Sequence, residues 1–91
     1  MVAEFNGEIT GYCLGFIHDT FYANGPVAWI EEIMVESSHR RSKVGHRLMA
    51  AFEAWAKENG AVLSALATRR AAHFYEAIGY EASATYYRRL L

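Results

Sequence analysis

The chain has 91 residues, of which 53% are hydrophobic and only one is proline, which suits one folded domain and excludes a disordered or multi-domain chain. A formal net charge of -1 and a single cysteine argue against a nucleic-acid surface, an intramolecular disulfide and a zinc site built from several thiolates. No apolar run suggests a membrane span and no secretion signal is visible. We therefore expect a single domain over residues 1–91 in a reducing, cytoplasmic setting.

Charge is unevenly distributed along the chain. Residues 1–36 hold acidic residues but no lysine or arginine, and all nine basic residues follow them. Such asymmetry suits a protein that handles an anionic ligand on one side and a cationic ligand on the other. Chance segregation onto solvated faces explains it equally well.

The first part of the chain predicts three strands. Residues 2–5 and 8–19 flank Asn6-Gly7, a dipeptide that favours a type I′ turn, so they predict a β-hairpin. Asn24-Gly25-Pro26 breaks the chain before a third strand at about residues 27–35. Strict alternation would place Trp29, Glu31, Ile33 and Val35 on one face of that strand and Ile30, Glu32 and Met34 on the other. Both faces are largely apolar, as in a central strand covered on two sides.

The second part predicts two helices. Apolar residues recur at helical spacing from about residue 44 to 58, and Asn59-Gly60 supplies a stop signal. A short strand near 61–67, a helix near 69–78 that ends at Gly79, and a β-prone tail through Thr85, Tyr86 and Tyr87 follow. The expected order is β-β-β-α-β-α-β, an α/β fold with a mixed central sheet flanked by helices. A crossover helix would join the third and fourth strands, which are therefore expected to be parallel.

A basic turn, residues 40–47, joins the strand residues Ile33 to Val35 to the first helix. Unpaired backbone N–H groups and the positive helix end converge at such a junction. The sequence therefore predicts a site for a phosphorylated ligand there.

This segment resembles the cofactor-binding motif of the GNAT superfamily of N-acetyltransferases, in which Arg or Gln is followed after two residues by Gly, one residue, and Gly or Ala. Arg40 matches the first position and Gly45 the last, whereas Lys43 occupies the place of the first glycine. Glycine adopts backbone conformations that a residue with a Cβ atom disfavours, so a lysine at this position restricts the conformations that the loop can adopt. A second segment, Ala71 to Tyr80, is similar to a later helix of the family, with Thr68 where the family often has Asn.

The resemblance implies a truncated GNAT-like acetyltransferase fold and an acetyl-CoA-dependent N-acetyltransferase acting on a primary amine of a small molecule or peptide. It implies that loop amides bind the pyrophosphate, that the Ile33 N–H is the oxyanion donor, and that the strand near Val35 pairs with the pantetheine arm. The cofactor-binding residues it implies are Ile33, Met34, Val35, Arg40, Arg41, Ser42, Lys43, Val44, Gly45, His46 and Thr68. No metal is expected, because His18 and His73 have no second ligand at metal spacing.

Two residues are candidates for acid–base chemistry. Tyr75 falls on the tyrosine that serves as general acid in many family members; the alternative is a helix tyrosine whose ring packs while its hydroxyl meets water. Glu31 is the better match for the acidic residue that is a candidate base in related acetyltransferases. Glu32 would point to the opposite face of the strand, because adjacent strand residues alternate in direction. A solvated carboxylate or ion pair is the alternative for Glu31, and an ordered water or bulk solvent would then take the proton.

Domains of this family usually begin with a further strand and two helices before the part that this chain resembles. We therefore expect a homodimer or larger assembly in which a second chain covers the exposed edge of the sheet or completes the acceptor site. The acidic first third of the sequence hints at a cationic amine as the acceptor, without identifying one.

The alternative function is a non-catalytic module of the same fold that binds CoA or a protein partner. No nucleic acid or membrane partner is expected.

Overall fold

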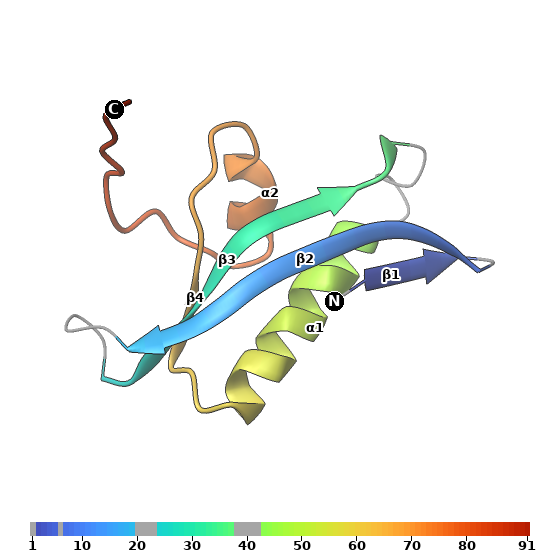
Figure 1. The fold of residues 1–91 in the computed structure, drawn as a ribbon, viewed down its shortest axis with the longest axis horizontal. Helices are drawn as coiled ribbons and strands as arrows, with labels where there is room; N and C mark the ends of the chain where they lie inside the picture. The colour runs from blue at the N-terminus through green and yellow to red at the C-terminus, as the bar shows by residue number, and fades with distance from the viewer. Residues whose placement is uncertain (1, 6, 20–23, 38–42) are drawn as a thin grey trace.

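The computed structural model describes residues 2–5, 7–19, 24–37 and 43–91. Four strands form one sheet in the order β1-β2-β3-β4, and two helices accompany them (Figure 1). The elements are β1 (Val2–Phe5), β2 (Glu8–Asp19), β3 (Pro26–Val35), α1 (Val44–Glu58), β4 (Leu63–Ala65) and α2 (Ala72–Ala77). The first three strands are antiparallel and β4 is parallel to β3, which confirms the predicted mixed α/β sheet.

Helix α1 spans the residues that the apolar spacing predicts. Its buried residues are Val44, Leu48, Met49, Phe52 and Ala56, and they face β2 and β3. Gly15 of β2 makes this approach possible, because a Cβ atom there would lie 2.3 Å from Cε1 of Phe52. The helix ends at Asn59, whose Nδ2 donates a 2.8 Å hydrogen bond to the Trp55 carbonyl.

A β-bulge interrupts β3 at Glu31. Leu14 of β2 pairs with Glu32 while Gly15 pairs with Ile30, so Glu31 is an extra residue on β3. The bulge changes the phase of alternation, and Ile30, Ile33 and Val35 all contact the same core. The expectation that Ile30 lies on the face opposite Ile33 is therefore wrong, since it assumed an uninterrupted ladder.

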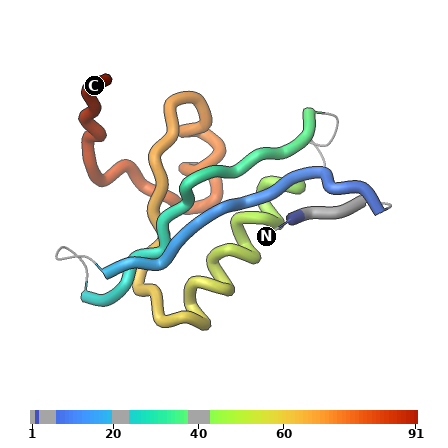
Figure 2. Tube along the Cα trace, in the orientation of Figure 1, coloured from blue at the N-terminus to red at the C-terminus, as the bar shows by residue number. Residues whose placement is uncertain are grey.

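Strands β3 and β4 run side by side for only a short distance and then diverge (Figure 2). Their pairing joins Val27 to Leu63, Ala28 to Ser64 and Trp29 to Ala65. Beyond Trp29, no strand in the described part of the chain pairs with β3 on this side. Residues 30–35 therefore present a strand edge toward the space near α2.

The last part of the chain is less regular than predicted. Helix α2 is shorter than expected, because Thr68 Oγ1 accepts a 3.2 Å hydrogen bond from the Ala71 N–H and holds the preceding residues in a turn. Residues 80–91 form no strand, so the predicted final strand is wrong. Tyr86 and Tyr87 are exposed there, and β-propensity does not build a strand without a partner to pack against. Neither described helix has the length and apolarity to cross a membrane.

Both helices lie on one face of the sheet. Tyr75 of α2 belongs to the same buried cluster as Leu48 and Phe52 of α1 and Cys13 of β2. On the other face, which we call the open face, large apolar side chains alternate with the core residues of β2 and β3. Leu14 and Phe16 of β2 and Met34 of β3 are 45%, 53% and 49% exposed there. Among the described elements, no helix covers the open face.

Candidate active site

Two pockets meet beside the diverging part of β3. The helix pocket, of about 520 Å³, lies between β3, the start of α1 and α2; it is lined by Ile33, Val35, Lys43, Gly45, His46, Ala71, Phe74 and Tyr75. The loop pocket, of about 420 Å³, lies between β3 and the segment that joins β4 to α2. Ile33, Ala71 and Tyr75 line both pockets. These three residues form the boundary that the two pockets share.

The helix pocket has hydrogen-bond donors and a positive helix end at the start of α1. The first hydrogen bond inside the helix runs from the Arg47 N–H to the Lys43 carbonyl at 3.1 Å, so the N–H groups of residues 44–46 have no partner within the helix. No acidic residue lies in the first turn to neutralise the positive helix end. Gly45 lets Phe74 of α2 lie close to the start of α1, because a Cβ atom there would be 3.3 Å from Cζ of Phe74.

Lys43 immediately precedes α1 in a left-handed conformation, with φ 65° and ψ 24°. It is the only non-glycine residue with a positive φ in the part of the chain that the structure describes. Left-handed backbone geometry disfavours a residue with a Cβ atom, which accounts for the glycine at this place in the motif that the chain resembles. The lysine thus adopts the conformation of the glycine and adds an exposed positive charge beside the helix end.

Tyr75 is buried between the two pockets and is 8% exposed. Its ring packs edge-on against the rings of Phe74 and Tyr80, with distances of 5.0 Å and 5.9 Å between ring centroids. Burial raises the pKa of its hydroxyl above the usual value, and the neighbouring Cys13 thiol contributes in the same direction. Both effects disfavour the phenolate form of this side chain.

Tyr80 fixes α2 to the rest of the fold. Its hydroxyl lies 2.8 Å from Oε2 of Glu53 on α1 and 2.8 Å from Oγ of Ser64 on β4. Its backbone N–H donates a 2.9 Å hydrogen bond to the Tyr75 carbonyl. Burial is the main cause that raises the pKa of Tyr80 to about 12. Sequence reasoning gave this residue no role, although it is the aromatic residue that follows Gly79 in the second matching segment.

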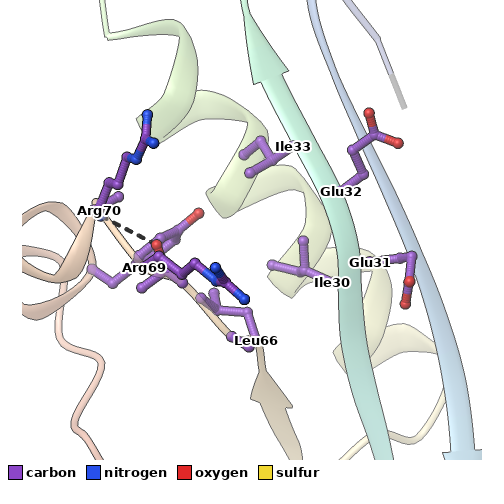
Figure 3. Close-up of a pocket in the computed structure, with 11 residues that line it drawn as sticks. Ile30, Glu31, Glu32, Ile33, Leu66, Arg69 and Arg70 are labelled. Atoms are coloured by element: carbon purple, nitrogen blue, oxygen red, sulfur yellow. Dashed lines mark hydrogen bonds between the residues drawn. The ribbon is translucent and has the colours of Figure 1, made fainter. Parts of the chain in front are cut away.

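The two glutamates of β3 do not point into the loop pocket. Figure 3 shows their carboxylates on the side of β3 opposite Ile30 and Ile33. Oε2 of Glu31 accepts a 3.1 Å hydrogen bond from Trp29 Nε1, and Glu32 accepts one from the Tyr12 hydroxyl. The expectation that the strand separates the two carboxylates is wrong, because Glu31 sits at the bulge. Both glutamates line the loop pocket together with Tyr75, but their carboxylates lie on the side of β3 away from Ile30 and Ile33.

The remaining predicted site residues are dispersed. Val44 is buried in the core, and Met34 is on the open face. Thr68 lines the loop pocket rather than the helix pocket, and its hydroxyl binds the Ala71 N–H. Arg40, Arg41 and Ser42 lie outside the described residues. Within the described ranges, no group of three or more potential metal ligands gathers.

A family model for the acetyltransferase (GNAT) family matches residues 1–80. The chain belongs to this family. A search of the curated proteins found no match.

Solved structures share the fold. An acetyltransferase from Trypanosoma brucei is 25% identical, with a TM-score of 0.82 over 93% of this chain and 61% of its own. The aminoglycoside N-acetyltransferase AAC(6')-Iy, solved with CoA, is 26% identical, with a TM-score of 0.80 over 99% of this chain and 74% of its own. Glucosamine-6-phosphate N-acetyltransferase from Arabidopsis thaliana is 22% identical, with a TM-score of 0.82 over 92% of this chain and 58% of its own. The chain thus spans about three-fifths of the first and third of these proteins.

Proposed function

We propose that the protein is an acetyl-CoA-dependent N-acetyltransferase that acts on a primary amine of a small molecule or peptide. The observation that carries this proposal is the junction of the two pockets at Tyr75. One pocket ends at the positive end of α1, and the other opens beside the loop after β4. A donor in the helix pocket and an acceptor in the loop pocket would meet beside a buried, protonated hydroxyl.

The helix pocket fits a pyrophosphate and an amide-bearing arm. The N–H groups of residues 44–46 and the Lys43 ammonium supply donors to phosphate, and Arg40, Arg41 and Ser42 are expected to add to them. The strand edge at Ile33 to Val35 has no pairing strand on its β4 side in the described structure, so it can pair with an amide-bearing arm. We assign the Ile33 N–H as the donor that stabilises the developing oxyanion.

The proposed reaction breaks a C–S bond and forms a C–N bond. Acetyl-CoA, when bound, supplies an acetyl thioester whose carbonyl carbon the amine attacks. Tyr75 donates its proton to the sulfur that leaves, and regains a proton from solvent. The proton of the amine passes to water in the loop pocket, because the carboxylates of Glu31 and Glu32 lie on the side of β3 opposite Ile33 and accept hydrogen bonds from Trp29 and Tyr12. Glu31 as a direct base stays a prediction from the sequence.

A release assay tests this proposal. CoA formation from acetyl-CoA with pooled primary amines is compared between the wild-type protein, Tyr75→Phe and Tyr86→Phe, whose exposed ring is outside both pockets. We expect loss of an acid to lower turnover by about 100-fold or more in Tyr75→Phe, with no change in Tyr86→Phe. Equal rates in all three proteins would remove Tyr75 from the mechanism.

A non-catalytic CoA-binding module is the second candidate. Two observations favour it, the strained backbone of Lys43 and the outward direction of the Glu31 carboxylate. It predicts binding of acetyl-CoA with no amine-dependent release of CoA. The release assay separates the two functions directly.

We also propose that a second copy of the chain covers the open face, in a reducing, cytoplasmic setting. Exposed Leu14, Phe16 and Met34 on a four-stranded sheet form an apolar surface of the kind that mediates association. Light scattering over a wide concentration range tests this: we expect twice the chain mass, and a monomer at every concentration would refute it. Leu14→Lys is expected to shift the equilibrium toward the monomer.

A further inference from the structure

The direction of the charged side chains around the loop pocket bears on the kind of acceptor, for which the acidic first third of the sequence hinted at a cationic amine. Four of its lining residues bear charge: Glu31, Glu32, Arg69 and Arg70. The carboxylates of both glutamates lie on the far side of β3, and they are hydrogen-bonded to Trp29 and Tyr12. The two arginines come from the segment between β4 and α2, on the pocket side. The charge that faces a ligand in this pocket is therefore that of guanidinium groups.

The two arginines differ in direction. Figure 3 shows the Arg69 side chain extending across the pocket between Leu66 and Ile30, whereas the Arg70 side chain turns away from Arg69. Among the described residues, neither arginine forms an ion pair with a carboxylate. Both side chains are exposed, and Thr68 Oγ1, bonded to the Ala71 N–H, helps to fix the backbone that bears them. Arg69 is thus a cation held over an apolar floor with no anion of its own beside it.

We propose that the acceptor carries one anionic group, a phosphate or a carboxylate, beside its primary amine, and that Arg69 binds this group. This inference rests on the proposed function, and it names the substrate class of the same site. A guanidinium matches carboxylate and phosphate oxygens with two parallel hydrogen bonds, which is the strong form of such contacts. At about 420 Å³ the pocket has the size of a small-molecule site.

The same charge also helps the chemistry. The amine must lose a proton before it attacks, and a nearby guanidinium disfavours the ammonium form. The anionic group of the same molecule offsets the repulsion between Arg69 and the ammonium during binding. A polycation such as spermidine has no group to offset it, so it is expected to be a poor acceptor.

Matched pairs of acceptors test the inference and separate phosphate from carboxylate. Turnover is measured with glucosamine 6-phosphate against glucosamine, with alanine against alaninamide, and with spermidine. We expect kcat/KM for the anionic member of at least one pair to be about tenfold or more higher. Arg69→Gln should abolish that preference, while Arg88→Gln, in the exposed tail, should keep it. Equal values within both pairs, or a preference for spermidine, would overturn the inference.

Two further measurements keep this test independent of catalysis. If no amine supports release of CoA, the proposed function fails, and the same acceptor pairs are then titrated into the CoA-loaded protein by calorimetry. Tighter binding of an anionic member in wild type than in Arg69→Gln would support the site, and no difference would overturn it. The affinity for acetyl-CoA alone is expected to be the same in both proteins. A weaker affinity in Arg69→Gln would place Arg69 on the donor side and refute its assignment.

Discussion

The hydroxyl of Tyr80 lies 2.8 Å from Oε2 of Glu53, a contact that ties the end of α2 to the middle of α1. Ser64 of β4 meets the same hydroxyl at 2.8 Å, and the Tyr80 N–H binds the carbonyl of Tyr75. Three elements thus converge on one side chain next to the proposed acid. Because α2 is only six residues long, these contacts rather than its own helical hydrogen bonds hold Tyr75 in place.

Replacing Tyr80 is expected to weaken the fold and the site together. Tyr80→Phe removes both contacts of the hydroxyl, and we expect a loss of about 1 to 3 kcal/mol in the free energy of unfolding. The partly buried Glu53 and Ser64 are left without this partner. Denaturant titration measures the loss, with Tyr87→Phe in the exposed tail as the control. A difference below the error of the titration would contradict the positioning role.

The same residue predicts a pH dependence of stability. The folded protein raises the pKa of Tyr80 to about 12 from a usual value of about 10, so the folded state holds the phenolic proton more tightly than the unfolded state. This contribution is complete below the unfolded pKa and is lost as pH rises through the folded pKa. We expect the stability advantage of wild type over Tyr80→Phe to shrink between pH 10 and about 12. An advantage that stays constant across this window would refute the assignment.

Turnover should depend on pH through Tyr75. Because burial raises the pKa of this hydroxyl, it loses its proton at a higher pH than an ordinary tyrosine does. We expect the alkaline decline in kcat that belongs to the acid to lie at a higher pH than for an ordinary tyrosine and to be absent in Tyr75→Phe. A pH–rate profile with an amine in excess measures it. An identical alkaline limb in both proteins would assign that limb to another group.

The left-handed Lys43 predicts opposite effects on stability and on binding. Lys43→Gly relieves the positive φ and is expected to stabilise the fold by up to about 1 kcal/mol. It also removes a charge beside the phosphate site, so we expect weaker acetyl-CoA binding. Lys43→Ala removes the charge and keeps the strain, and it should weaken binding without raising stability. Tighter binding by Lys43→Gly would mean that the side chain obstructs the pocket.

The outward carboxylate of Glu31 predicts a modest role. Glu31→Gln keeps an acceptor for Trp29 Nε1, and we expect kcat/KM to change by less than about threefold. Glu32→Gln serves as the comparison, because its carboxylate lies on the same side of β3. A loss of about 100-fold in Glu31→Gln alone, with partial recovery at high pH, would restore Glu31 as the base.

Periodicity predicted the long elements well because burial dominates them. Val44, Leu48 and Phe52 fix α1, and the predicted first hairpin is present as the antiparallel pairing of β1 with β2. The bulge at Glu31 could not be predicted, because it depends on how β3 pairs with β2 rather than on the local sequence. The bulge is the reason that the prediction for the face on which Ile30 lies was wrong.

The candidate site was partly predictable. The resemblance located Tyr75 and the start of α1, which the structure brings to the same pocket. It did not locate the Tyr80 contacts, because Glu53 and Ser64 are distant in sequence and unremarkable in type. It also assigned no role to Arg69, whose meaning depends on where Glu31 and Glu32 point.

A calorimetric titration of the purified protein with acetyl-CoA tests the central claim most directly. The account predicts saturable binding in the micromolar range, retained by Tyr75→Phe and weakened by Lys43→Ala. Because the N–H groups of α1 carry the proposed phosphate site, a folded protein that shows no binding would contradict it. Such a result would leave the fold with a role in binding another partner.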